Sequence, residues 1–231
     1  MKLYLIRHGD PDYENDTLTE RGHAEAQALT EYLRHEEIHE VVTSPLGRAR
    51  ATADYTAQAL ELPVRIEEWM AELRLLAETE QKRSAWDVNG HAIRNSDYLA
   101  DPTAFERIPG MPADRLRRLL DEIRASSDRF LASLGYVREN GVYRVARQND
   151  RRIAAFAHGG FGLTWLSILL EIPTPLMWSG FFLHTSSVTQ ILFDEREDGL
   201  ATPRCLMTSA LPHLFAAGLV PSTAGVKANY T

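Results

Sequence analysis

The N-terminal stretch KLYLIRHGDPDY, residues 2–13, carries the main signal for both the fold and a functional site. Its first five residues form an apolar run that is too short for a helix, so we expect a buried strand over residues 2–6. This run is followed by Arg7, His8 and Gly9. An Arg–His pair at a strand end is either ordinary surface polarity or part of a phosphate-binding site beside a nucleophile, and the rest of the chain has to distinguish the two.

The composition is that of an ordinary globular protein. The chain has 231 residues, of which 44% are hydrophobic, and this suffices for the core of one large or two small domains. A net charge of -7 argues against a general binder of nucleic acids or membrane surfaces. The single cysteine, Cys205, excludes an internal disulfide framework and a multi-cysteine zinc site, and it is typical of a reducing compartment.

The sequence contains no segment with the length and apolarity of a membrane-spanning helix. The most apolar region, residues 161–183, is interrupted by Glu171, Pro173 and Pro175. The apolar run at the N-terminus is shorter than the core of a signal peptide. We therefore expect a cytoplasmic protein without nucleic-acid or membrane partners, and the sequence leaves its oligomeric state open.

Predicted strands alternate with predicted helices along the chain. Short apolar runs predict further strands over residues 40–44, 62–66, 152–157 and 186–195, and helical spacing predicts helices over residues 17–37, 46–60, 116–134 and 161–171. Asn140 and Gly141 lie between two β-rich runs and predict a hairpin. The alternation predicts an α/β fold, namely a three-layer α/β/α sandwich with a mostly parallel central sheet and helices on both faces.

Residues 77–112 interrupt this alternation. They show no clean period and contain Asn-Gly, Asp-Pro and Pro-Gly breakers. Since long loops in compact domains are uncommon and often functional, we expect a cap segment inserted over the active site. Residues 1–215 then form one domain, and residues 216–231 a loosely ordered C-terminal tail. Five residues of the insert either contact an anionic substrate or belong to a solvated loop: Lys82, Arg83, Trp86, His91 and Arg94.

Polar residues follow the predicted strands where each one ends. The first strand is followed by Arg7 and His8, and the strand over residues 152–157 by His158. The helix after the second strand carries Arg48 in its first turn. Because ligands of open α/β sheets bind beyond the carboxyl ends of the strands, we expect these side chains to share one site.

These residue types meet the requirements of phosphoryl transfer. Two guanidinium groups are always charged, and each matches a pair of phosphate oxygens. A neutral histidine attacks phosphorus when an acceptor, such as a backbone carbonyl beside a glycine, holds the proton on its other ring nitrogen. His158, at a strand-to-helix turn, adds a donor and a helix N-terminus. A carboxylic acid with a raised pKa is still needed to protonate the leaving oxygen.

Three motifs together resemble a known family. LIRHG at residues 5–9, TSPLGRARATA at residues 43–53 and AHGG at residues 157–160 are similar in order and spacing to motifs of the histidine phosphatase superfamily, also called phosphoglycerate-mutase-like. The resemblance covers roughly residues 1–76 and 150–193. The set of three is far more specific than any one motif.

The resemblance implies a role for each matching residue. His8 would be the phosphorylated nucleophile, in a phosphate pocket completed by Arg7, Arg48 and His158. Glu72 lies best for the general acid, and Glu68 is the second choice. The remaining predicted substrate-binding residues are Gly9, Asn15 and Gly159. No cofactor and no metal ligand is expected.

The sequence also departs from the family pattern. Many members carry a Thr and an Asn after the Arg-His-Gly motif, whereas Asp10, Pro11 and Asp12 follow here, and Asn15 is displaced from the expected position. The insertion that phosphoglycerate mutases carry before their first helix is absent. This difference favours a phosphatase over a mutase.

The leading hypothesis is therefore a histidine-acid-phosphatase-like enzyme that hydrolyses phosphomonoesters without a metal, through a phosphohistidine on His8. Its ligand would be a small phosphorylated substrate or inorganic phosphate. Two alternatives stay open: a phosphotransferase of the phosphoglycerate mutase type, and a catalytically weak member that binds phosphorylated ligands. A metalloprotein ranks last because none of the histidines has a metal-ligand spacing. The sequence does not identify the substrate.

Overall fold

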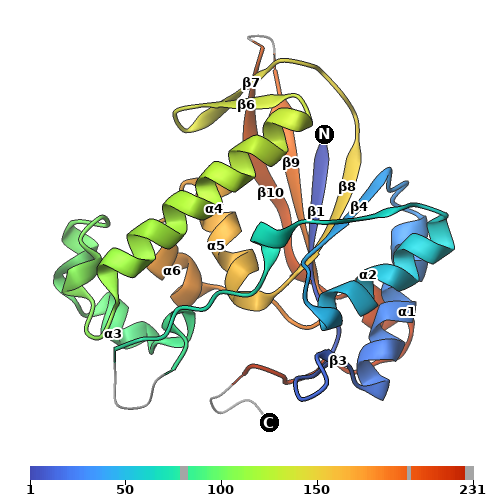
Figure 1. The fold of residues 1–231 in the computed structure, drawn as a ribbon, viewed down its shortest axis with the longest axis horizontal. Coiled ribbons are helices and arrows are strands. Elements are labelled where there is room, and N and C mark those ends of the chain that lie inside the picture. Colours follow the sequence, from blue (N-terminus) through green and yellow to red (C-terminus); the bar gives the residue numbers. More distant parts are fainter. Residues whose placement is uncertain (79–82, 197–198, 227–231) are drawn as a thin grey trace.

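The protein, described by a computed structural model over residues 1–78, 83–196 and 199–226, has an eight-stranded sheet between two layers of helices (Figure 1). The strands of this sheet are β1 (Lys2–Arg7), β4 (Glu40–Thr43), β5 (Val64–Ile66), β6 (Tyr136–Glu139), β7 (Val142–Val145), β8 (Arg152–Ala157), β9 (Val188–Glu195) and β10 (Leu200–Ala210). They lie in the order β5-β4-β8-β1-β9-β10-β7-β6. The predicted α/β class is confirmed.

The sheet is mixed rather than mostly parallel. β5, β4, β8 and β1 are parallel neighbours, whereas β9, β10, β7 and β6 continue the sheet antiparallel. The reason lies in the connections, because a short turn joins only antiparallel strands. β6 and β7 form the hairpin predicted at Asn140-Gly141, with Asn140 at a φ of 59°. β9 and β10 are likewise joined by a short connection after Glu195.

The helices cover both faces of the sheet. They are α1 (Glu20–Arg34), α2 (Gly47–Leu60), α3 (Gly90–Arg94), α4 (Ala113–Ser133), α5 (Gly159–Leu170), α6 (Thr174–Gly180) and α7 (Pro212–Ala216). Successive side chains of a strand point to opposite faces, so the side chains of β1 pack against the helices on both faces of the sheet. Tyr4 and Ile6 pack in the cluster with α1 and α2, and Leu3 and Leu5 pack in the cluster with α5. Burial on both faces explains why β1 is a continuous apolar run.

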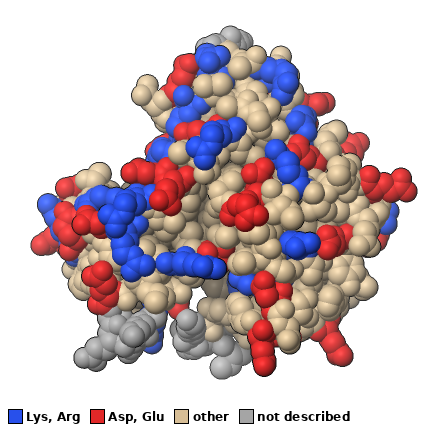
Figure 2. Space-filling view, in the orientation of Figure 1, with Lys and Arg blue, Asp and Glu red and all other residues tan. Residues whose placement is uncertain are grey.

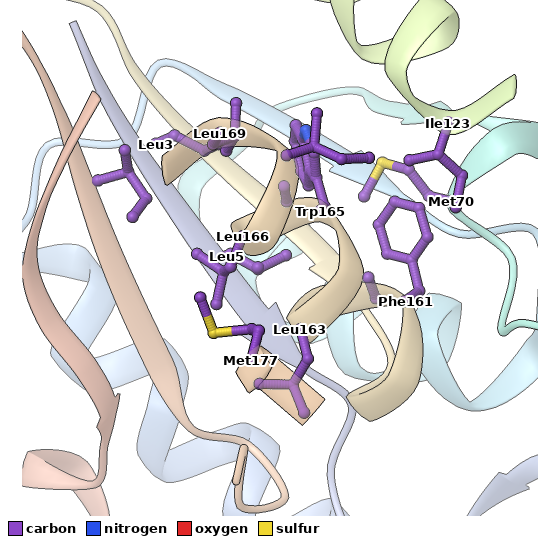
Figure 3. Close-up of a cluster of buried hydrophobic side chains, with 14 of the residues drawn as sticks. Leu3, Leu5, Met70, Ile123, Phe161, Leu163, Trp165, Leu166, Leu169 and Met177 are labelled. Atoms are coloured by element: carbon purple, nitrogen blue, oxygen red, sulfur yellow. The ribbon is translucent and has the colours of Figure 1, made fainter. Parts of the chain in front are cut away.

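The larger core surrounds α5, which is predominantly apolar and buried on every side from Gly160 to Leu169. Trp165 is fully buried, and its ring lies 5.0 Å from Trp69 and 6.0 Å from Phe130. Figure 3 shows Trp165 and Phe161 of α5 beside Met70, which follows β5 in the chain, and Ile123 of α4. This cluster joins the sheet to the long helix α4, and so it fixes α5, whose N-terminus reaches the site described below.

The segment predicted as an insert contains short helices between longer connections. The 3-10 turns η2 (Ala85–Asp87), η3 (Asp97–Ala100) and η4 (Phe105–Arg107) lie with α3 between the undescribed residues 79–82 and α4. Ile93 and Tyr98 are buried in the larger core. The described part of the segment is therefore packed onto the domain. Its helices are too short to leave a helical period in the sequence.

Two short strands, β2 (Pro11–Asp12) and β3 (Thr17–Leu18), and the 3-10 turn η1 (Glu68–Met70) complete the elements.

The larger core predicts the response to one matched pair of substitutions. Trp165→Ala removes a fully buried ring and leaves Ser127 Oγ without the indole donor that lies 2.8 Å away. We expect a loss of about 3–5 kcal/mol in the free energy of unfolding, measured by urea denaturation. Phe215→Ala, at a position that is 91% exposed, should change it by less than about 0.5 kcal/mol. Equal effects of the two substitutions would contradict the assignment of the core.

Candidate active site

Three neighbouring parallel strands bring the motif residues to one edge of the sheet. β4, β8 and β1 are adjacent, and Ser44, His158 and His8 directly follow their ends. The main chain continues the ladder there: His8 N–H donates to Ala157 O at 3.0 Å, and Ser44 N–H donates to Phe156 O at 2.9 Å. The rings of His8 and His158 consequently lie with their centroids 5.2 Å apart.

The His8 ring has a defined tautomer. Its Nδ1 lies 2.7 Å from Gly9 O, and a carbonyl only accepts, so Nδ1 carries the proton and Nε2 the lone pair. Burial lowers the pKa of His8 well below its usual value, and the charges of Arg7 and Arg48 act in the same direction. The ring is therefore neutral. Arg48 Nε donates to His8 Nε2 at 3.3 Å, so the nitrogen with the lone pair faces a guanidinium.

Arg7 is a buried cation held by the main chain. Its Nη1 donates to Leu183 O at 2.6 Å and its Nη2 to Ala224 O at 3.3 Å. Its Nε has no hydrogen-bond partner among the described residues. A Cβ on Gly159 would lie 3.6 Å from that Nε, so the glycine keeps the space beside it open. Arg7 therefore offers an unpaired N–H and a full positive charge.

Arg48 is oriented by Asp16, a residue that the sequence analysis does not single out. Its Nη1 donates to Asp16 Oδ1 at 2.5 Å, while Gly47 N–H donates to Asp16 Oδ2 at 2.7 Å. Asp16 has a φ of 47°, and a Cβ on Gly47 would lie 2.1 Å from its carbonyl oxygen. Glycine is thus required at 47 for this close approach. The guanidinium of Arg48 also lies over the Tyr13 ring, 5.5 Å from its centroid.

His158 is the N-cap of α5 and bonds to Ser44. Ser44 Oγ accepts from Leu46 N–H at 3.2 Å and lies 2.7 Å from His158 Nε2. In the tautomer in which Nε2 accepts the Ser44 proton, the ring proton is on Nδ1. This nitrogen is buried and has no hydrogen-bond partner in the described part of the chain. Burial lowers the pKa of His158, so the ring is neutral and presents one N–H.

Glu72 follows η1 and reaches the N-terminus of α5. Its Oε1 accepts from Phe161 N–H at 2.8 Å and from Leu73 N–H at 3.0 Å, whereas its Oε2 accepts from Gly160 N–H at 3.2 Å. Burial raises the pKa of Glu72 above its usual value, although the three backbone hydrogen bonds act in the opposite direction. Oε2 has the weaker contact and is the oxygen better placed to carry a proton.

Part of the C-terminal segment forms one edge of the site. The Ser222 hydroxyl donates to the Asp10 carboxylate, and Arg21 Nη2 donates to Val220 O at 2.7 Å. Ala224 O accepts from Arg7, as described above, and Gly225 lines the cavity beside it. Ala224 and Gly225 of the predicted tail therefore lie against Arg7, while residues 227–231 lie outside the described chain.

These groups surround a cavity of about 520 Å³. The side chains of Arg7, His8, Arg48 and Glu72 line one part of it. The rest of the wall is formed by Tyr13, Ser84, Trp86, Asp87, Gly159, Gly160, Leu163, Trp178, Phe181, Phe182, Leu183 and Gly225. One end of the cavity thus joins two cations, a neutral imidazole and a carboxyl group with a raised pKa, which is an arrangement suited to an anionic ester.

The structure brings together most of the residues predicted from the sequence. Of the predicted substrate-binding residues, Gly159 lines the cavity, but Gly9 and Asn15 are not among its lining residues. Gly9 N–H bonds to Thr52. Asn15 bonds to Asp12 in an exposed turn. His158 lies just behind the lining residues, bonded to Ser44.

Of the two candidate acids, Glu72 lines the cavity and Glu68 is exposed outside it. In the insert, Trp86 lines the cavity and Arg94 Nη2 lies 3.5 Å from Ser179 O. Lys82 lies outside the described residues.

Sequence reasoning missed Asp16, Ser44 and Tyr13. The residue type of Asp16 is a weak indication of a turn, because Asp and Asn tolerate the left-handed backbone conformation. Nothing in the sequence, however, says that this turn lies against Gly47.

Other site types find little support in the described chain. Among the described residues, no group of three or more His, Cys, Asp or Glu side chains is arranged to hold a metal ion. Over the same residues, none of the helices combines the length and apolarity needed to cross a membrane. Basic and acidic side chains are interspersed on the face shown in Figure 2, so this face offers no broad surface of one sign to a polyanion.

Solved structures share the fold at low identity. A mycobacterial glucosyl-3-phosphoglycerate phosphatase aligns with a TM-score of 0.60 and 22% identity, covering 90% of this chain and 99% of that one. A phosphoserine phosphatase from Entamoeba histolytica aligns with a TM-score of 0.62 and 21% identity, covering 92% of this chain and 98% of that one. At these identities the likeness concerns the fold.

Sequence comparison identifies the family. A probable phosphoglycerate mutase, GpmB, from Erwinia tasmaniensis is 28% identical over 135 residues, which are 52% of this chain and 62% of the relative. The match thus spans about three-fifths of the length of that curated relative. The profile of the histidine phosphatase superfamily (branch 1) matches residues 3–132, more than half of the chain. With the motifs gathered at one sheet edge, this match makes the chain a member of the histidine phosphatase superfamily, branch 1.

Proposed function

We propose that this protein hydrolyses phosphomonoesters without a metal ion, through a phosphohistidine formed on His8. The observation that carries the proposal is the hydrogen bond from His8 Nδ1 to Gly9 O, which leaves Nε2 as a neutral nucleophile facing Arg48. Arg7 and Arg48 supply the positive charge that a transferring phosphoryl group needs. The members with solved structures named above are phosphatases, which favours hydrolysis as the outcome.

In the first step, the phosphate group takes the place of the Arg48 contact at His8 Nε2. Nε2 then attacks phosphorus, and the bond from phosphorus to the ester oxygen breaks. Arg7 Nε, Arg48 and His158 Nδ1 donate to the equatorial oxygens, where negative charge is carried in the transition state. Glu72 Oε2 transfers its proton to the departing oxygen, so the alcohol leaves neutral.

In the second step, the roles of Glu72 reverse. Its carboxylate, now without the proton, takes a proton from a water molecule as the water oxygen attacks phosphorus. The bond between phosphorus and His8 Nε2 breaks, and inorganic phosphate is released. The imidazole returns to its neutral state with the proton still on Nδ1, and Glu72 is protonated again, so the cycle closes.

A phosphotransferase of the mutase type is the second candidate, because the curated relative from Erwinia tasmaniensis is described as a probable phosphoglycerate mutase. Such an enzyme must keep its phosphohistidine until a second acceptor binds. The chain between Gly9 and α1 is only a short turn that contains β2 and β3. This short connection leaves the pocket without the extra segment by which mutases differ, and it favours water as the acceptor.

The nucleophile is tested by His8→Ala. We expect a loss of about 10³-fold or more in kcat for p-nitrophenyl phosphate, with unchanged unfolding. The matched control His35→Ala, at an exposed histidine that follows α1 and does not line the cavity, should retain full activity. Rapid quenching of the wild type with labelled substrate should give an acid-labile label on His8, and activity should persist in excess chelator.

Each opposite result identifies one of the alternatives. Retained activity in His8→Ala excludes the phosphohistidine route. A label that survives in water and passes only to phosphoglycerate indicates a mutase. Tight binding of inorganic phosphate by the wild type, with neither label nor turnover, indicates a ligand-binding member.

The general acid is tested by Glu72→Gln against Glu68→Gln. Glu72→Gln should lower kcat/KM by about 10²–10⁴-fold for an alkyl phosphate, whose alcohol needs a proton to leave. It should lower kcat/KM far less for p-nitrophenyl phosphate, because nitrophenolate leaves unprotonated. Because the pKa of Glu72 is raised, wild-type kcat/KM for the alkyl ester should fall as the pH rises through that pKa. This decline should vanish in Glu72→Gln, and an equal loss in Glu68→Gln would reassign the acid.

The Asp16 anchor is tested by its effect on Arg48. Asp16→Ala frees the guanidinium and should lower kcat/KM for p-nitrophenyl phosphate by about tenfold, because the cation is no longer positioned. Asp16→Asn keeps an oxygen for Gly47 N–H or Arg48 and should lose less than Asp16→Ala. Asp54→Ala removes the same charge from an exposed site on α2 and serves as the control. Equal activity of all three variants would show that Asp16 does not position Arg48.

A further inference from the structure

Away from His8, most of the cavity wall is aromatic or aliphatic, and Ser84 and Asp87 add polar side chains to it. Six apolar side chains line it: Trp86, Leu163, Trp178, Phe181, Phe182 and Leu183. They come from η2, from α5, and from α6 with the residues that follow it. Phe181 and Phe182 remain 44% and 36% exposed. Large aromatic rings left exposed at the rim of a cavity indicate a surface that a ligand covers.

Trp86 lies where the leaving group must pass. A Cβ on Gly160 would lie 2.7 Å from the Trp86 indole and 2.9 Å from Glu72 Oε1. The indole and the carboxyl group therefore meet over the same glycine. Since the ester oxygen has to lie within hydrogen-bond distance of Glu72 to receive its proton, the organic part of the substrate extends along the Trp86 ring.

The charged side chains of the wall are distributed unevenly. Among the described lining residues, the cations are Arg7 and Arg48, both beside His8, and the carboxyl groups are those of Glu72 and Asp87. Arg7 is held by Leu183 O and Ala224 O, and its guanidinium lies 5.8 Å from the centroid of the Phe182 ring, whereas Arg48 is held by Asp16. Beyond Phe182, a second anionic group on the substrate would meet aromatic rings and the Asp87 carboxyl group, with no further cation among the described lining residues to pair with. Such a desolvated charge is costly.

We propose that the substrate of this site is a phosphomonoester whose alcohol is uncharged and carries an aromatic ring. The inference rests on the proposed phosphatase function and adds the class of the leaving group. The ring stacks on Trp86 beside Glu72, and Phe181 and Phe182 cover it from the rim. Esters that bear a carboxylate or a second phosphate, such as phosphoglycerate or phosphoserine, are poor substrates.

The test compares three primary alkyl esters, so that the intrinsic reactivity of the leaving group is similar. These are 2-phenylethyl phosphate, glycerol 3-phosphate and 3-phosphoglycerate. We expect kcat/KM for the phenylethyl ester to exceed that for 3-phosphoglycerate by about 10²-fold, with glycerol 3-phosphate between them. A higher kcat/KM for 3-phosphoglycerate than for the phenylethyl ester overturns the proposal.

Substitutions in the aromatic part of the cavity wall test whether these side chains cause the preference for the phenylethyl ester. Trp86→Ala and Phe181→Ala should each lower kcat/KM for the phenylethyl ester by about tenfold, while glycerol 3-phosphate changes by less than about threefold. Phe215→Ala, which removes an exposed ring that does not line the cavity, is the matched control. Phe181 is partly exposed, so its variant remains informative if Trp86→Ala fails to fold. Equal losses on all esters in the folded variants would show a structural role and overturn the proposal.

Binding separates this inference from the proposed function. If the wild type hydrolyses no ester, including p-nitrophenyl phosphate, the phosphatase proposal fails on its own. Calorimetry with two non-hydrolysable ligands, 3-phenylpropylphosphonate and 3-phosphonopropionate, then decides the class of ligand. Tighter binding of the phenyl compound supports the aromatic pocket, and equal or tighter binding of the carboxylate overturns it.

Discussion

The hydrogen bond of 2.7 Å between the His8 ring and Gly9 O determines which nitrogen faces the cavity. It depends on a main chain held from both sides, because His8 N–H bonds to Ala157 O and His8 O accepts from Ser186 N–H at 3.0 Å. A Cβ on Gly9 would lie 2.7 Å from Gly22 O, so the glycine lets α1 pack closely behind His8. The pairing of β1 with β8 and the contact with Ser186 thus hold the main chain whose carbonyl sets the tautomer of the His8 ring.

The two arginines differ in how their charge is balanced. Arg7 is bonded to the carbonyl oxygens of Leu183 and Ala224, which orient it without neutralising it. Arg48 pairs with Asp16, whose side chain is 43% exposed and therefore solvated. Burying an uncompensated guanidinium costs free energy that the surrounding packing must offset. The unpaired Nε of Arg7 then retains its attraction for a dianionic phosphate, which is the reason to keep such a group at the edge of the core.

The sequence predicts best what is set by local pattern. β1 and β8 are buried on both faces and read as apolar runs, and their polar ends mark the sheet edge. β10 is not predicted, because its outward residues are exposed and Pro203 interrupts its pattern. Asn15 is predicted to bind the substrate, whereas Asp16 beside it anchors Gly47 and Arg48, a contact that depends on the left-handed turn packing against α2. Contacts of Ala224 and Gly225 with Arg7 are tertiary and leave no trace in local sequence.

The two ends of the cavity are built by different parts of the fold. Similarity to relatives therefore does not identify the substrate. The end of the cavity that we propose binds phosphate lies at the strand ends that carry Arg7 and His8, whose positions follow from the sheet itself. The aromatic wall is built by η2 and by the chain from α6 to Leu183, which are connections rather than layers. Connections vary at little cost to the fold. Phosphatases and mutases with different substrates can therefore share the phosphate end, and the leaving group has to be inferred from the side chains of this chain's own wall.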